Sequence, residues 1–148
     1  GTPRILVPMI SAMDHVRWFK RVLAEEYAAL CAQGVPARMP PLGAMIEVPS
    51  VVGLMDDLCA EFDFFSIGSN DLLQYFTEID RARVGTGALH DPLDPEFLRL
   101  LMQASVTARR HGRPIGLCGE MAADPRLLAL FTSFRASSSY HRSSYSSV

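Results

Sequence analysis

The stretch GAMIEVP at residues 43–49 indicates the fold of this chain, because a short apolar run ends abruptly at a carboxylate. The pattern recurs at residues 64–71, FFSIGSND, which end in an amide and a carboxylate, and at residues 114–120, PIGLCGE, which bring a thiol. In a sheet covered by helices, functional side chains gather at the carboxyl ends of the strands. We therefore expect three strand ends to surround one pocket. The side chains concerned are Glu47, Asp71 and Cys118.

Apolar runs and helical patterns alternate through residues 1–131. This alternation is typical of parallel βα units, and strands that are apolar throughout are expected where both faces of a sheet are covered. A complete (β/α)8 barrel takes about 250 residues, so four units predict an α/β fold that is part of a TIM barrel. An open doubly wound sheet is the alternative, but the chain has neither a G-x-G-x-x-G turn nor a P-loop. The expected strands are Arg4–Ile10, Ala44–Val48, Phe64–Ile67 and Pro114–Cys118.

The spacing of apolar residues predicts four helices between these strands. Ser11 or Asp14 is expected to start the first helix. The chain divides into a barrel domain over residues 1–131 and a Ser-rich tail over residues 132–148, which is expected to be disordered because it cannot bury an apolar face. The predicted helices are Met13–Gln33, a helix from Pro49 to about Phe62, Leu72–Phe76 and Glu96–His111.

The composition narrows the class of protein. Hydrophobic residues make up 49% of the 148 residues, which is typical of a globular chain. The net charge is −2 with no basic block, which argues against a nucleic-acid partner, and no apolar run reaches the roughly 20 residues that span a bilayer. The cysteines lack metal-binding spacing, so we interpret them as reduced thiols of a cytoplasmic protein. Two of them, Cys31 and Cys59, are expected in the core.

Oxygen-bearing side chains near the second and third strand ends favour a hard metal ion. Mg²⁺ takes one or two protein carboxylates and completes its shell with water and substrate oxygens. Glu47 and Asp71 could supply the carboxylates, with the amide of Asn70 beside them. Two structural alternatives stay open: Asp71 as a plain helix cap, and Glu47 in a salt bridge inside the barrel.

Cys118 and Arg81 are the other candidates for chemistry. Glu120 lies near Cys118, and a neighbouring negative charge favours the protonated thiol, which suits a proton donor better than a nucleophile. A buried inert cysteine is the alternative. Arg81, expected in a loop after the third strand, could hold a phosphate or carboxylate, and a solvated loop arginine is its alternative.

Four segments in this order resemble the phosphoenolpyruvate-utilising enzymes, and among them enzyme I of the bacterial sugar phosphotransferase system. They are G-x-M-I-E-V-P at residues 43–49, D-F-F-S-I-G-S-N-D-L-x-Q-Y at residues 63–75, D-R at residues 80–81 and G-L-C-G-E-M-A-x-D-P at residues 116–125. The resemblance covers about residues 1–130 and also includes RILVPMI at residues 4–10. It implies strands four to seven of a (β/α)8 barrel that binds phosphoenolpyruvate and Mg²⁺.

The resemblance also implies roles for single residues. Glu47 and Asp71 match metal ligands. Asn70 and Arg81 match residues that bind the substrate phosphate, and Asp71 is expected among the substrate-binding residues as well. Cys118 matches the acid that protonates the methylene carbon of enolpyruvate to give pyruvate. In the parent enzyme this implies phosphoryl transfer to a protein histidine, a phosphocarrier partner in sugar uptake, and a homodimer.

Departures from the family keep other functions open. No histidine in the chain matches the family's phosphoryl acceptor, and the Ser-rich tail stands where an eighth strand is expected. The isolated chain is therefore expected to be inactive, as a truncated half barrel. A fragment of pyruvate phosphate dikinase or of phosphoenolpyruvate synthase is the other alternative, since these enzymes share the site.

Overall fold

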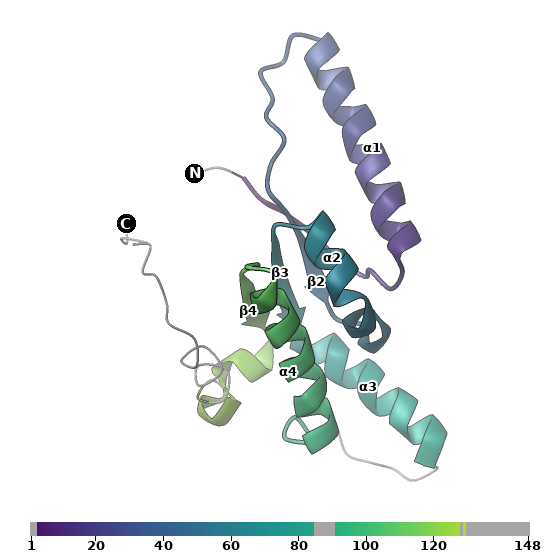
Figure 1. The fold of residues 1–148 in the computed structure, drawn as a ribbon, viewed down its shortest axis with the longest axis vertical. Helices are drawn as coiled ribbons and strands as arrows, with labels where there is room; N and C mark the ends of the chain where they lie inside the picture. Colours follow the sequence, from purple (N-terminus) through teal and green to yellow (C-terminus); the bar gives the residue numbers. More distant parts are fainter. Residues whose placement is uncertain (1–2, 85–90, 128, 130–148) are drawn as a thin grey trace.

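One sheet of four parallel strands forms the centre of the molecule (Figure 1). The computed structural model describes residues 3–84, 91–127 and 129, with residues 80–84 described by their backbone alone. The strands lie in the order β1-β2-β3-β4, whereas a doubly wound sheet reverses its strand order. The predicted α/β fold built from four βα units is therefore confirmed. The bounds are β1 (Ile5–Val7), β2 (Leu42–Ile46), β3 (Phe64–Gly68) and β4 (Ile115–Cys118).

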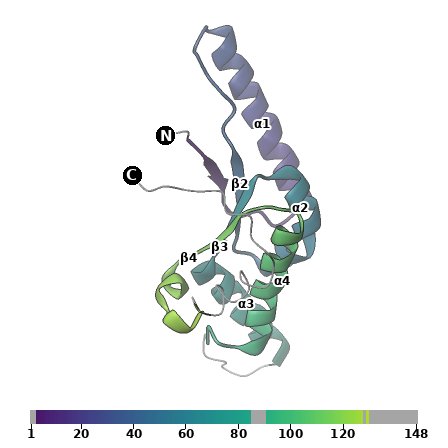
Figure 2. The ribbon, with the colours of Figure 1, turned by 60° about the vertical axis from the view of Figure 1, so that its left-hand side comes forward.

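Helices lie between consecutive strands, and α1, α2 and α4 lie on the same side of the sheet (Figure 2). This is the arrangement of a barrel wall, whose helices form an outer ring. None of the helices in the described part of the chain has the length and apolar character to cross a lipid bilayer. The helices are α1 (Met13–Ala32), α2 (Met55–Glu61), α3 (Ser69–Val84) and α4 (Pro95–Arg110), with 3₁₀ segments η1 (Pro49–Leu54) and η2 (Glu120–Ala123).

The two faces of the sheet differ in burial. Neighbouring strands pair in register, so paired residues lie on the same face. The covered face packs against the helices, and its central residues Ala44, Ile46, Phe65 and Ile67 are buried. We call the other side the open face, because most of its side chains are half-exposed. The open face consists of Leu6, Gly43, Met45, Phe64, Ser66, Gly68, Gly116 and Cys118.

Helix α3 corrects two predictions. It runs from Ser69 to Val84 instead of Leu72–Phe76, because no glycine or proline interrupts residues 69–84 and its apolar residues keep a helical spacing. Arg81 therefore lies on a helix and not in a loop. Its side chain falls outside the described part of the structure, as does the predicted tail, residues 132–148.

The first βα unit corrects two further expectations. β1 covers only Ile5–Val7, because Pro8 and the left-handed backbone of Met9 (φ 55°) end the strand. Ala12 is the N-cap residue of α1 and supplies no side-chain hydrogen bond, so neither Ser11 nor Asp14 starts this helix as predicted.

The cysteine predictions had different outcomes. Cys59 is buried in the core, as predicted. Cys31 is exposed, and the prediction that it lies in the core is wrong. The reason is that α1 projects beyond the sheet (Figure 1), so that Val16 is its one buried residue.

Candidate functional site

Three predicted strand ends meet at the carboxyl edge of the sheet. Ile46 pairs with Ile67, so Glu47 lies beside Gly68, and Gly68 pairs with Cys118. Neighbouring strands lie about 4.8 Å apart. The carboxylate and the thiol therefore stand on the same face, two strand spacings apart, with Gly68 between them. The side chains of Glu47 and Met45 lie over this glycine, within 3.2 Å of where a Cβ would stand.

Glu47 is a buried carboxylate without a partner cation in the described part of the chain. Its side chain is only 3% exposed. The N–H of Met9 donates to Oε1 of Glu47 at 2.6 Å, and the positive φ of Met9 aims this N–H across from the end of β1. Oε2 makes no hydrogen bond among the described residues, and a Cβ on Gly68 would fall 3.2 Å from it. One oxygen is thus held in place, while the other lies over Gly68, where the sulfur of Met45 also lies.

The carboxylate oxygens of Glu47 and Asp71 fit a hard cation. Burying a carboxylate is costly unless hydrogen bonds or a cation compensate for the lost hydration, and the predicted barrel salt bridge of Glu47 is not found among the described residues. Asp71 is exposed in the first turn of α3, at the same edge. No cluster of three or more His, Cys, Asp and Glu side chains occurs in the described ranges. Mg²⁺ does not require one, because water and substrate oxygens complete its shell.

Cys118 is held by three contacts to β3 and the start of α3. The hydroxyl of Ser66 donates to Sγ at 3.3 Å, and the thiol donates to the carbonyl oxygen of Ile67 at 3.1 Å. The hydroxyl of Ser69 donates to the carbonyl oxygen of Cys118 at 2.7 Å. The thiol is half-buried and hydrogen-bonded, so its position is defined, in contrast to that of the exposed Cys31.

The segment after Cys118 packs tightly against the start of α3. The N–H of Glu120 donates to Oδ1 of Asn70 at 3.0 Å. Gly119 has a φ of 95°, and a Cβ there would lie 2.5 Å from Oγ of Ser69 and 2.8 Å from Oδ1 of Asn70. Because Oδ1 of Asn70 is occupied, its NH₂ group is the part left to donate to a ligand. The first N–H groups of α3 also lack intrahelical partners, as at every helix start.

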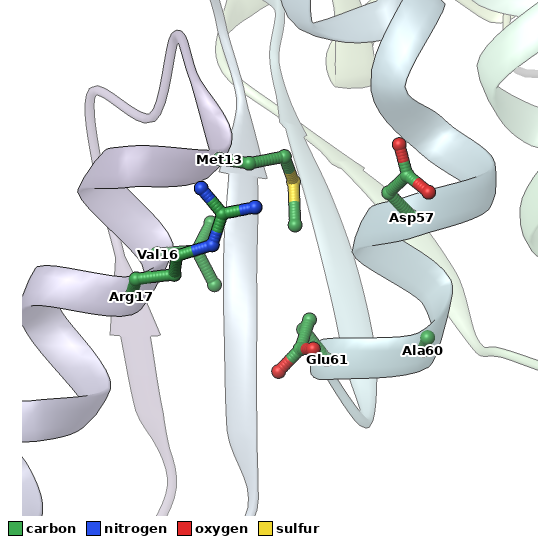
Figure 3. Close-up of a pocket in the computed structure, with 6 residues that line it drawn as sticks. All are labelled: Met13, Val16, Arg17, Asp57, Ala60 and Glu61. Carbon is green, nitrogen blue, oxygen red and sulfur yellow. The ribbon is translucent and has the colours of Figure 1, made fainter.

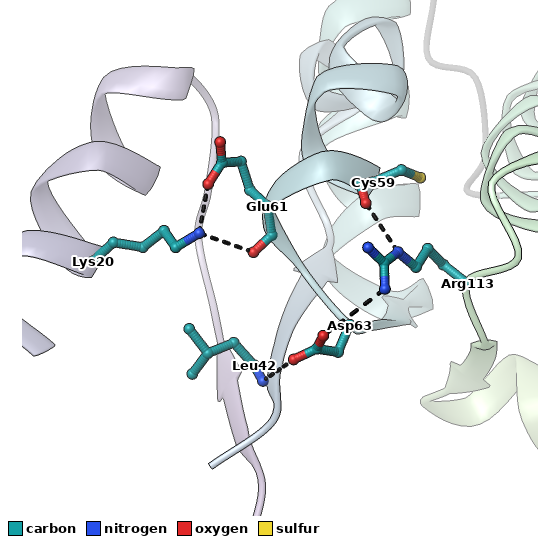
Figure 4. Close-up of polar contacts among 6 residues, drawn as sticks. All are labelled: Lys20, Leu42, Cys59, Glu61, Asp63 and Arg113. Atoms are coloured by element: carbon teal, nitrogen blue, oxygen red, sulfur yellow. Dashed lines mark hydrogen bonds and ion pairs between the residues drawn. The ribbon is translucent and has the colours of Figure 1, made fainter. Parts of the chain in front are cut away.

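The opposite, amino edge of the sheet carries charges that pair with one another (Figure 4). Lys20 joins Glu61 at 2.5 Å, which connects α1 to α2. Asp63 accepts the N–H of Leu42 at 2.9 Å and lies 3.8 Å from Arg113, which also donates to the carbonyl oxygen of Cys59. These contacts hold the elements together and leave no buried charge unpaired among the residues drawn.

A pocket of about 280 Å³ lies elsewhere, between α1 and α2 (Figure 3). Two of its three charged side chains have partners: Arg17 pairs with Asp14, and Glu61 pairs with Lys20. None of the predicted site residues lines it. The pocket is lined by Met13, Val16, Arg17, Asp57, Ala60 and Glu61.

Several residues of this edge were missed by the sequence reasoning. Ser66 and Ser69 act through partners about 50 positions away, which only the strand register reveals. Met9 contributes through its backbone, so its side chain gave no signal. The one available signal was Gly119, since a glycine after the thiol indicates a close approach.

Comparison with known proteins identifies the family. Residues 1–138 match the family described as PEP-utilising enzyme, PEP-binding domain. Multiphosphoryl transfer protein 2 of Escherichia coli K12 is 44% identical over 131 residues, which are 88% of this chain and 16% of that protein. The phosphoenolpyruvate-protein phosphotransferase of Geobacillus stearothermophilus is 42% identical over 126 residues, which are 84% of this chain and 22% of that protein. The chain thus spans less than a quarter of the length of these relatives.

Solved structures show a shared fold at low sequence identity. A citrate lyase from Burkholderia xenovorans LB400 superposes with a TM-score of 0.59 at 19% identity, covering 88% of this chain and 40% of that one. The citrate synthase SbnG gives a TM-score of 0.55 at 16% identity, covering 88% of this chain and 51% of that one. These likenesses concern the fold alone. The family match and the identities of about 40% go further: the chain belongs to the PEP-utilising enzymes, in their PEP-binding domain.

Proposed function

We propose that this chain is part of a phosphoenolpyruvate–protein phosphotransferase, which transfers the phosphoryl group of phosphoenolpyruvate to a protein histidine and releases pyruvate. The observation that carries this proposal is the row formed by Glu47, Gly68 and Cys118 on adjacent strands. The row puts a carboxylate that has no counterion among the described residues and a hydrogen-bonded thiol on the same face of the sheet, two strands apart. Metal-assisted cleavage followed by protonation of a carbon requires these two groups.

In this proposal Glu47 and Asp71 hold Mg²⁺ together with substrate oxygens. Bound Mg²⁺ would offset the negative charge that grows on the enolate and on the transferred phosphoryl group. The NH₂ group of Asn70 and the free N–H groups at the start of α3 donate to the phosphate, because a helix N-terminus favours anions. Arg81 is proposed as a further phosphate ligand.

Cys118 completes the reaction as the acid. When the phosphoryl group has left, the methylene carbon of the enolate takes the thiol proton and pyruvate forms. The position of the thiol, fixed by Ser66 and Ile67, supports this role because it stands on the same face as Glu47. The finer expectations belong to the parent enzyme and are proposed with it: cytoplasmic sugar uptake, a phosphocarrier partner and a homodimer.

Titration calorimetry of the chain with Mg²⁺, and with Mg²⁺ plus phosphoenolpyruvate, tests the site. We expect Glu47→Gln to weaken Mg²⁺ binding at least tenfold, since it removes the charge that attracts the cation. Asp63→Asn removes a carboxylate from the amino edge and serves as the matched control, with binding unchanged. Equal binding by the Glu47→Gln variant and the parent chain would contradict the proposed site.

A second measurement separates the site from the whole reaction. The chain alone is expected to release no pyruvate from phosphoenolpyruvate and a phosphocarrier protein, since no histidine in it matches the acceptor. Pyruvate release by the purified chain would contradict the expectation that the chain alone is inactive. Restored turnover on adding a separate histidine-bearing domain would favour the phosphotransferase over the dikinase or the synthase.

A further inference from the structure

Ser66 is the one polar side chain within β3, and it lies on the open face. Its hydroxyl donates to Sγ of Cys118 at 3.3 Å, and this is its one side-chain hydrogen bond in the part of the chain that the structure describes. The residues flanking it, Phe65 and Ile67, are buried on the covered face. Within the described ranges, the hydroxyl in this apolar strand therefore has no side-chain partner except the thiol.

The sulfur of Cys118 takes part in two hydrogen bonds of opposite sense. It accepts from Ser66 and donates its proton to the carbonyl oxygen of Ile67 at 3.1 Å. The two contacts fix both where the sulfur lies and where its proton points. Loss of the proton would remove the bond to Ile67 and leave the bond from Ser66 in place.

We propose that Ser66 is a positioning residue for Cys118, which orients the thiol before proton transfer and donates a hydrogen bond to the thiolate afterwards. The inference rests on the proposed function, in which Cys118 is the acid. In the transfer step the enolate's electron pair forms the new carbon–hydrogen bond. The sulfur–hydrogen bond breaks, and its electron pair stays on sulfur as a thiolate. A hydrogen bond to a charged acceptor is stronger than one to a neutral acceptor, so the Ser66 contact strengthens as the charge develops.

The rate of Cys118 alkylation by iodoacetamide tests this contact without any substrate. The parent chain carries Cys31→Ser to remove the exposed thiol, and peptide mass spectrometry follows Cys118 separately from Cys59. With Ser66→Ala we expect alkylation of Cys118 near neutral pH to slow about tenfold, because the thiolate loses its hydrogen-bond donor. Ser66→Thr, which keeps the hydroxyl, should restore the parent rate.

Two controls distinguish this role from a general change in structure. Ser105→Ala removes a buried hydroxyl that has no partner, on α4, and should leave Cys118 unaffected. Cys59 is an internal reference, because burial, followed by the charge of Asp56, raises the pKa of its thiol and its reaction reports opening of the core. The titratable groups on the neighbouring strand ends, Glu47, Asp71 and Glu120, are the same in every variant.

The outcomes are separable from those of the proposed function. An unchanged Cys118 rate in Ser66→Ala, or an equal change at Cys59, would overturn the positioning role. A slower rate in Ser66→Ala without rescue by Ser66→Thr would overturn it too, because the hydroxyl would not be the cause. Failure of the proposed function would instead appear as absent Mg²⁺ and phosphoenolpyruvate binding, whatever the alkylation rate.

Discussion

At the amino edge of the sheet, Lys20, Glu61, Asp63 and Arg113 satisfy one another's charges. At the carboxyl edge, Glu47 is buried beside a glycine, and among the described residues the N–H of Met9 is its one hydrogen-bond partner. Both edges belong to the same four strands and the same core. The contrast supports the proposal that the carboxyl edge binds a ligand, because a buried charge without a counterion is costly unless a ligand supplies one.

The largest expected effect is from Gly119→Ala, which breaks the carboxyl edge directly. The new Cβ would lie 2.5 Å from Oγ of Ser69, and the φ of 95° is strained for any residue with a side chain. We expect the free energy of unfolding to fall by about 2 kcal/mol in urea denaturation.

Gly116→Ala, within β4 and three residues before Gly119, is the matched control. A Cβ at Gly116 has nothing within 4 Å, and its φ is not positive. Its effect should stay within about 0.5 kcal/mol. Equal losses for the two alanine variants would mean that the close packing after Cys118 has no special weight.

Two carboxylate substitutions, one at each edge, should change the free energy of unfolding in opposite directions. Without divalent cations at neutral pH, Glu47→Gln should raise the free energy of unfolding by about 1 kcal/mol, since it removes an unpaired buried charge and keeps an acceptor for Met9. Asp63→Ala should lower it by about 1 kcal/mol, because the N–H of Leu42 loses its acceptor. Urea denaturation of both variants checks this. A loss in both would show that Glu47 stabilises the fold by itself.

The smallest expected effect is on the pH dependence of stability, through the ion pairs of Asp56 on α2 with Arg110 and His111 at the end of α4. Hydrogen bonds from His111 and then Arg110 lower the pKa of Asp56 below its ordinary value near 3.8. The folded state therefore holds its charge to lower pH than the unfolded state, so the contribution is present above about pH 4 and is lost as the pH falls through the lowered value. Between neutral pH and pH 3, the melting temperature of the Asp56→Asn variant should fall less than that of the parent chain. An identical acid sensitivity of the two chains would exclude this pair as a source of stability.

The sequence predicted the position of a residue well when that position depends on its own segment, and poorly when it depends on contacts with distant segments. Glu47 and Cys118 were placed correctly, because each ends an apolar run and parallel strands bring such ends to one edge. Arg81 was misplaced, because a run without glycine or proline continued α3 through the expected loop. Ser66 was passed over, because its importance arises from pairing with a strand some 50 residues away. Cys31 was assigned to the core from local composition, which does not reveal that α1 extends past the sheet.

The N–H of Met9 gives the molecule an internal reporter. Backbone amides at strand ends normally bond to carbonyl oxygens or water, whereas this one bonds to a carboxylate at 2.6 Å. Charge-assisted hydrogen bonds are shorter and stronger than neutral ones. A cation on Oε2 would draw electron density from Oε1 and weaken that bond. The amide resonance of Met9 in a nuclear magnetic resonance spectrum would then move as a cation binds Glu47. Cation binding at a buried carboxylate could thus be followed from a single backbone proton.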